Sequence, residues 1–141
     1  MGEQKTKRLL NNRTAINLLI KTFYAKVRKD DRLGPIFNSQ VKDWPEHLER
    51  LTDFWETNLL FRRVYKGNPL KAHIDTDRRV GQSITSAHFG RWLQLWFETI
   101  DKDFYGEHAE RAKNHARKMS THIFMKIFQS RGDSPKINFT E

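Results

Sequence analysis

The stretch Asn12–Lys29 reads NRTAINLLIKTFYAKVRK, and its apolar residues recur with the period of a helix. The positions i, i+3, i+4, i+7 and i+11 are Ile16, Leu19, Ile20, Phe23 and Val27. This spacing places them on one face of an amphipathic α-helix, for which Asn12 is a suitable N-cap. The helix is expected to stop at residues 30–35, because Gly34 and Pro35 cannot continue it.

The same period recurs along the rest of the chain. Helices are predicted from residue 43, from residue 69, and over the ranges 86–103 and about 107–128. Residues 75–82 have little periodicity and are predicted to form a loop. Since no segment alternates like a strand for long, the predicted fold class is all-α.

Length and composition restrict the class of protein. With 141 residues, the chain is expected to form one globular domain over residues 1–129, followed by a disordered tail over 130–141. The absence of cysteine excludes disulfides, thiolate zinc sites and thiol nucleophiles. No segment approaches about 18 consecutive apolar residues, so we expect a cytoplasmic protein without a membrane partner.

Six histidines invite a metal hypothesis. His108, His115 and His122 are seven residues apart, or about 10.5 Å along a helix, which is too far for neighbours to share one ion. A lone histidine such as His73 is most often a half-buried side chain with one hydrogen bond. His47 and His73, however, lie on separate predicted helices beside apolar residues. Two imidazoles across an apolar cleft suit a flat iron cofactor, which needs a neutral nitrogen ligand and apolar walls.

Four stretches of the sequence point to a known family. They read FYAKVR followed by LGPIF (residues 23–37), WPEHL followed by FW (44–55), PLKAH (69–73) and FGRWLQLW (89–96). In order and spacing they resemble group III of the truncated haemoglobins, from about residue 16 to 127. The glycine pairs that mark groups I and II are absent. The resemblance implies a two-over-two helical sandwich with haem b (iron protoporphyrin IX) between its helix pairs.

The resemblance also implies roles for the residues near the metal. His73 would be the proximal iron ligand, with its second ring nitrogen donating to a carbonyl or carboxylate. Asp75 and Asp77 are candidate acceptors, although a backbone carbonyl is preferred. Tyr24 and Trp92 each fit either the core or the distal side of the haem, where the resemblance has both donate hydrogen bonds to a bound ligand.

Three further sets of residues are expected around the cofactor. His47 would occupy the distal gate, where it swings toward solvent, admits ligand or binds iron itself. The pocket wall is predicted to include Phe23, Leu51, Phe54 and Leu70. The haem propionates need cations, and the candidates are Arg50 first, then Arg78, Arg79 and Lys71. A solvated charge is an equally weighted interpretation for each of these four.

The leading functional hypothesis is a haem protein that binds dioxygen or another diatomic ligand. Distal donors that hold oxygen tightly argue against storage and favour redox chemistry, such as nitric oxide dioxygenase or peroxidase-like activity with an unidentified reductase. The alternative is a basic helical nucleic-acid-binding module without haem, suggested by 26 Lys and Arg against 17 acids. Its weakness is that the basic residues are spread over all helices rather than collected on one recognition helix.

Overall fold

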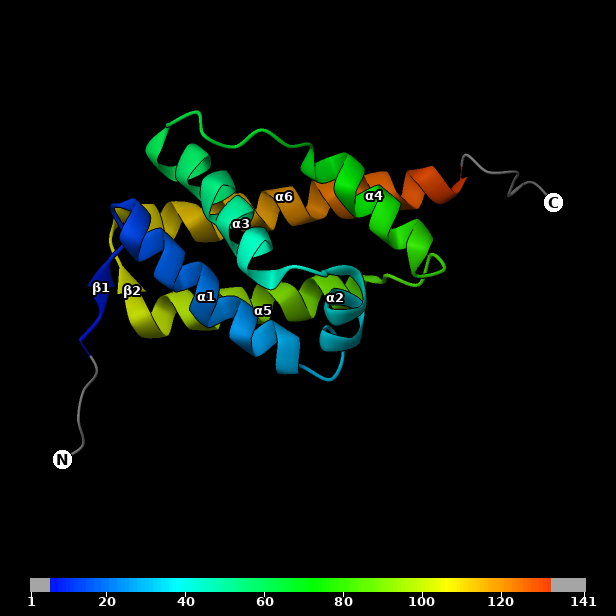
Figure 1. Cartoon of the computed structure of the whole chain (residues 1–141), viewed down its shortest axis with the longest axis horizontal. Helices are drawn as coiled ribbons and strands as arrows, with labels where there is room; N and C mark the ends of the chain where they lie inside the picture. The colour runs from blue at the N-terminus through cyan, green and yellow to red at the C-terminus, as the bar shows by residue number, and fades with distance from the viewer. Residues whose placement is uncertain (1–5, 133–141) are drawn as a thin grey trace.

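The computed structural model describes residues 6–132, which form helices and one very short pair of strands (Figure 1). The helices are α1 (Arg13–Lys29), α2 (Gly34–Gln40), α3 (Trp44–Leu60), α4 (Pro69–Arg79), α5 (Ser86–Asp103) and α6 (Glu107–Gly132). The strands β1 (Arg8–Leu9) and β2 (Phe104–Tyr105) pair in parallel. The all-α prediction is therefore confirmed.

Side chains next to the helix ends explain where several helices begin. Asn12 accepts a hydrogen bond from the backbone N–H of Ala15 at 2.9 Å, as expected for an N-cap. Asp43 and Asn68 cap α3 and α4 in the same way. Each of these two helices has a proline in its first turn, where no backbone N–H is needed. The sequence thus sets the start of each of these helices locally.

The helices form two crossed pairs. Helix α1 packs against α3, and α5 packs against α6, while α1 also lies on α5 and joins the two pairs. The core between them is apolar, and its largest fully buried side chains include Trp55, Trp96 and Phe23. This arrangement is the expected two-over-two sandwich. Helix α4 lies beside α6, at the edge of these pairs (Figure 1).

The structure corrects four local expectations. Residues 75–79 continue α4 instead of starting a loop, and residues 34–40 form the additional helix α2. The strands β1 and β2 were not predicted, because each has two residues and no alternation to detect. Helix α6 continues to Gly132, so residues 130–132 are helical, and the rest of the predicted tail lies outside the described residues.

The described residues also bear on a membrane location. Within residues 6–132, no helix combines the length and the apolar character needed to cross a bilayer.

A charged cluster fastens α1 to α3. The Arg13 guanidinium donates to Glu49 at 2.8 Å, to Asp53 at 2.7 Å and to Glu56 at 2.6 Å. The Glu56 side chain is only 5% exposed, whereas Arg62, its second partner, lies 3.3 Å away and is 64% exposed. A buried carboxylate is costly without a cation, so Arg13 should carry most of this interaction.

We expect Arg13→Ala to destabilise the protein by about 2 kcal/mol, because it removes the main partner of a buried charge in a partly exposed cluster. The control is Arg62→Ala, which should cost less than about 1 kcal/mol because its pair is exposed. Urea unfolding followed by circular dichroism measures both. Equal effects of the two substitutions would contradict this assignment.

Candidate functional site

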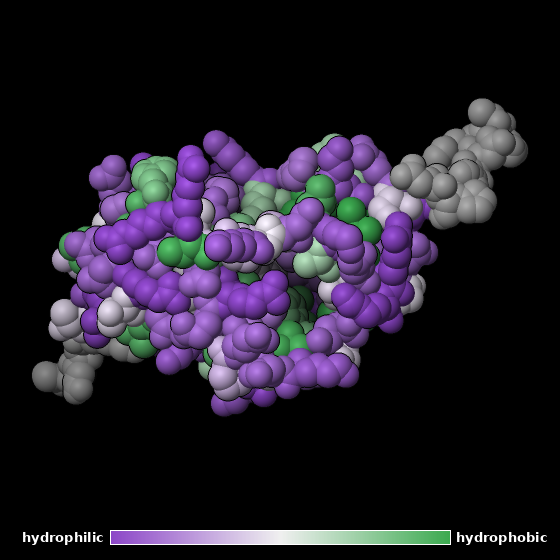
Figure 2. Space-filling model, turned by 45° about the horizontal axis from the view of Figure 1, so that its top comes forward, coloured by the Kyte–Doolittle hydropathy of each residue, from purple (hydrophilic) through white to green (hydrophobic). Residues whose placement is uncertain are grey.

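A cavity of about 270 Å³ lies between the helix pairs, with residues from all six helices in its wall. The wall is mostly apolar, and Arg50 is the one formally charged residue in the described part of the lining. Figure 2 shows a hydrophilic face that opens into a hollow with hydrophobic surface. The site is therefore a slot for a mainly apolar ligand with some polar contacts.

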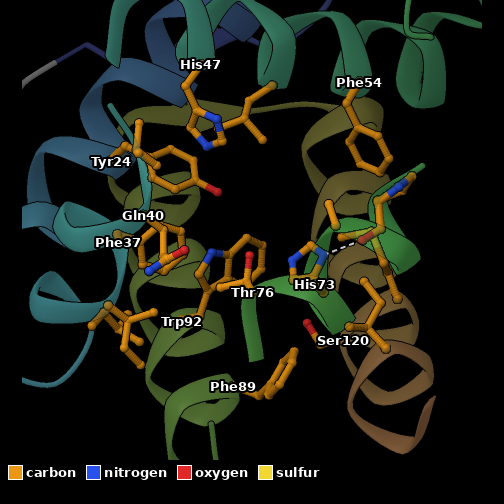
Figure 3. Close-up of a pocket in the computed structure, with 18 of the residues that line it drawn as sticks. Tyr24, Phe37, Gln40, His47, Phe54, His73, Thr76, Phe89, Trp92 and Ser120 are labelled. Carbon is orange, nitrogen blue, oxygen red and sulfur yellow. Dashed lines mark hydrogen bonds between the residues drawn. The ribbon is translucent and has the colours of Figure 1, made fainter. Parts of the chain in front are cut away.

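His73 projects from α4 into this cavity (Figure 3). Its Nδ1 lies 2.6 Å from the backbone carbonyl oxygen of Pro69, one turn earlier in the same helix. A carbonyl oxygen only accepts hydrogen bonds, so Nδ1 must carry the proton and Nε2 must carry the lone pair. This tautomer is the one in which Nε2 is able to bind a metal.

The surroundings of His73 keep its ring neutral. The ring has a large exposed surface, but that surface is part of the cavity wall, inside the molecule. Burial lowers the pKa of His73 below its ordinary value, and the hydrogen bond to Pro69 offsets only part of that effect. A neutral imidazole facing an apolar cavity has the chemistry of a metal ligand.

Tyr24 and Trp92 form the wall across the cavity from His73 (Figure 3). Burial strongly raises the pKa of the Tyr24 phenol, and the neighbouring Trp92 indole offsets part of that effect. Tyr24 is therefore a protonated phenol at ordinary pH. The Tyr24 hydroxyl and the Trp92 indole N–H are both hydrogen-bond donors, and both residues line the cavity that a ligand would occupy.

His47 points into the cavity from α3, on the same side as Tyr24 (Figure 3). Its ring lies edge-on to Trp44 at 5.5 Å and to Tyr24 at 6.4 Å between centroids. Burial lowers the pKa of His47, and the positive charge of Arg50 lowers it further. Two neutral imidazoles thus face the cavity from separate helices, as the sequence predicted.

A relative decides the family. Group 3 truncated hemoglobin ctb of Campylobacter jejuni is 31% identical over 125 residues, which cover 86% of this chain and 94% of that protein. This chain is a group III truncated haemoglobin. The crystal structure of group III truncated hemoglobin from Campylobacter jejuni agrees, with a TM-score of 0.76, 32% identity, and coverage of 86% of this chain and 95% of that one. No family model matches the chain.

The resemblance inferred from the sequence is thereby confirmed, and the globin is a haem-binding protein. The nucleic-acid alternative has no support from these findings. The residues of the site also fit a haem. His73 offers a lone pair on Nε2, its Nδ1 has the carbonyl partner that metal-bound histidines usually have, and the surrounding wall is apolar.

The basic residues predicted for this truncated haemoglobin separate into two kinds. Arg50 lines the cavity, as expected for its candidate role. Lys71, Arg78 and Arg79 do not line the cavity, and their role beside a propionate stays a prediction. Lys71 instead pairs with Asp75 at 2.7 Å on the outside of α4, and Arg78 donates to Ser130 at 3.1 Å. Arg79 is exposed at the end of α4.

The apolar residues predicted for the pocket wall also divide into those that line the cavity and those that do not. Leu51 and Phe54 line the cavity of the globin, as predicted. Phe23 and Leu70 do not, and their predicted place in the wall is corrected. Phe23 is fully buried behind the wall, with its ring edge-on to Tyr24 at 4.7 Å and to Trp92 at 5.1 Å. It therefore supports the two residues that line the cavity.

Sequence reasoning missed several polar residues of the site. Gln40, Thr76, His88 and Ser120 line the cavity of this globin and come from four different helices. His88 also accepts from the backbone N–H of Thr85 at 2.9 Å at the start of α5. Isolated polar residues of this kind carry no periodic signal, so only the fold brings them together.

Proposed function

We propose that His73 is the proximal ligand of haem b in this globin and that Tyr24 and Trp92 act on a diatomic ligand at the opposite face. The observation that carries the proposal is the pair of facing walls. His73 presents a neutral Nε2 from α4, and Tyr24 presents a protonated hydroxyl from α1, across one apolar cavity. The apolar cavity between these walls suits a porphyrin that His73 would hold through its iron.

When bound, haem would supply an iron that His73 would hold and that would bind a diatomic molecule such as dioxygen. The protein supplies orientation and hydrogen bonds. The Pro69 carbonyl fixes the His73 ring, while Tyr24 and Trp92 supply an O–H and an N–H at the opposite wall. The hydroxyl then donates to the ligand inside an apolar site, where a hydrogen bond is stronger than in water.

Arg50 is our candidate partner for a haem propionate. It is exposed, it lines the cavity, and no ion pair to an acid appears for it among the described residues. A guanidinium pairs well with a carboxylate and remains charged at any ordinary pH. His47 lies one turn before Arg50 in α3. A movement of either side chain would therefore change the opening of the cavity.

Replacement of His73 by alanine or glycine should cause loss of most haem at purification, because the axial nitrogen is removed. The absorbance ratio of the Soret band to the protein band measures this. In the glycine variant, added imidazole should restore hemin binding by filling the space of the lost ring. The control is His122→Ala, at an exposed position on α6. Full retention of haem with an unchanged spectrum in the His73 variants would refute the assignment.

Removal of either distal donor should speed dioxygen dissociation. A hydrogen bond to a ligand that carries partial charge contributes about 1.5–3 kcal/mol, so Tyr24→Phe and Trp92→Phe should each accelerate release by about tenfold to a hundredfold. Because the two side chains line one cavity and would act on the same ligand, the effects of the two single variants should not simply add in the double variant. Stopped-flow ligand displacement measures the rates. Unchanged rates in both single variants would place the distal donors elsewhere.

The reaction that we favour is redox chemistry on a bound diatomic ligand, with nitric oxide dioxygenase or peroxidase-like turnover as the two forms of it. Donors that hold a ligand tightly slow its release, which suits a reaction at the site better than a store. Such turnover needs electrons, so we also propose an unidentified reductase as a partner.

The oxygenated protein should consume nitric oxide faster than free hemin does, because Tyr24 and Trp92 retain and orient the ligand that nitric oxide attacks. An electrode selective for nitric oxide measures the loss, with the Tyr24→Phe variant as the matched control. Loss at the uncatalysed rate would remove nitric oxide dioxygenation and leave peroxidase-like turnover, which is assayed separately with peroxide and a reducing dye.

A further inference from the structure

Helix α4 is attached to the rest of the molecule in an unusual way. It packs chiefly against α6, with the cavity on another side. Its one buried residue is Asp77, whereas α1 buries a continuous apolar stripe. Helices of globular proteins are mostly held by an apolar face. Polar contacts must therefore hold α4, the helix that carries His73, in its position.

The anchor is a bidentate ion pair between Asp77 and Arg131 of α6. Arg131 donates to the two carboxylate oxygens from Nε at 2.9 Å and from Nη2 at 2.6 Å. The Asp77 side chain is only 3% exposed. Two parallel hydrogen bonds between a guanidinium and a carboxylate fix the relative orientation of the groups as well as their distance.

The same two side chains also hold the connection between α4 and α5. The backbone N–H of Ile84 donates to Asp77 Oδ1 at 3.2 Å, and Arg131 Nη2 donates to the Ile84 carbonyl at 2.6 Å. Ile84 is buried and lines the cavity. One cluster of polar contacts thus fastens the C-terminal end of α4, the following loop and the end of α6.

Asp77 and His73 are mechanically connected. They are four residues apart in one helix, so they lie on the same side, separated by about one turn, or about 6 Å. The His73 ring is hydrogen-bonded to its own helix through Pro69, and therefore moves with that helix. A shift of α4 at Asp77 would be transmitted to His73 Nε2.

We propose that Asp77 and Arg131 are positioning residues that hold α4 so that His73 Nε2 lies at the correct distance and angle for an axial bond. The proposal rests on the proposed function of His73 as the iron ligand. Functional groups of this kind must be held within about 0.5 Å of the productive geometry, and α4 has no fully buried apolar side chain to hold it there.

The test compares two asparagine substitutions in the same helix. Asp77→Asn keeps the size of the side chain and an acceptor for Ile84, but it removes the charge that faces Arg131. Asp75→Asn is the control, because Asp75 pairs with Lys71 within α4 and has no ion pair with another element in the described part of the chain. The readouts are the iron–histidine stretching band of the ferrous, ligand-free holoprotein by resonance Raman, and the rate of hemin transfer to excess apomyoglobin.

Asp77→Asn is expected to shift or broaden the iron–histidine band and to speed hemin loss by about tenfold, the usual scale for groups that orient a metal ligand. Arg131→Gln should do the same, and the double variant should add little to either single one. Arg131→Lys keeps the charge without the bidentate geometry and should give an intermediate result. It also serves as the test if the Asp77 variant does not fold.

Two results would overturn the proposal. One is an iron–histidine band and hemin loss in Asp77→Asn equal to those of Asp75→Asn. The other is a lower melting temperature with an unchanged band, which would show a role in stability alone. Failure of the proposed function is recognised separately, because then the wild-type protein would show no iron–histidine band, or His73→Ala would retain it.

Discussion

The Nδ1 atom of His73 donates to the carbonyl oxygen of Pro69 at 2.6 Å, and this contact determines which nitrogen faces the cavity. Its acceptor belongs to the first turn of the same helix, so the tautomer and the direction of the ring are set within α4. No other element is needed to orient the imidazole. What the rest of the fold must provide is the position of α4 as a whole, together with an opposite wall at a suitable distance.

The two walls of the cavity are held by different kinds of interaction. Tyr24 and Trp92 rest on Phe23, which also lies edge-on to Trp96 at 4.8 Å in the centre of the core. Close-packed aromatic rings have little freedom to move, so this wall is rigid. The wall that carries His73 depends instead on the ion pair of Asp77 with Arg131. Ion pairs respond to charge changes and to salt more than apolar packing does.

This difference also explains how much of the fold could be predicted from the sequence. Helix α5 was predicted to within its observed bounds, because its buried face shows the helical period and its ends carry clear signals. The second half of α4 was missed, since its buried residue is charged and its neighbours are polar, which gives no apolar stripe to detect. Helix α2 has only 7 residues, too few to show a period.

The site was predicted best where a residue matched a family motif. His47, His73, Tyr24 and Trp92 all face the cavity. Phe23 was predicted to line the cavity, but its neighbour Tyr24 does so. Consecutive residues of a helix point about 100° apart, so only one of Phe23 and Tyr24 can face the cavity. Spacing identifies the helix and its buried face, but it does not distinguish the part of that face that meets core from the part that meets a cavity.

The charge distribution around the cavity restricts the ligand that it accepts. The three histidines of the wall, His47, His73 and His88, have lowered pKa values and are neutral, and no acidic residue lines the described wall. The one formal charge, on Arg50, is exposed. A ligand with an apolar body and a carboxylate at its edge would place its charge next to Arg50 and its body against the wall, without burying an unpaired ion. A cationic ligand would find no carboxylate in the described wall to neutralise its charge and would be repelled by Arg50. Of the protein's many basic residues, Arg50 alone places a formal charge in the described cavity wall. This single cation favours an amphipathic anion over a polyanion such as nucleic acid.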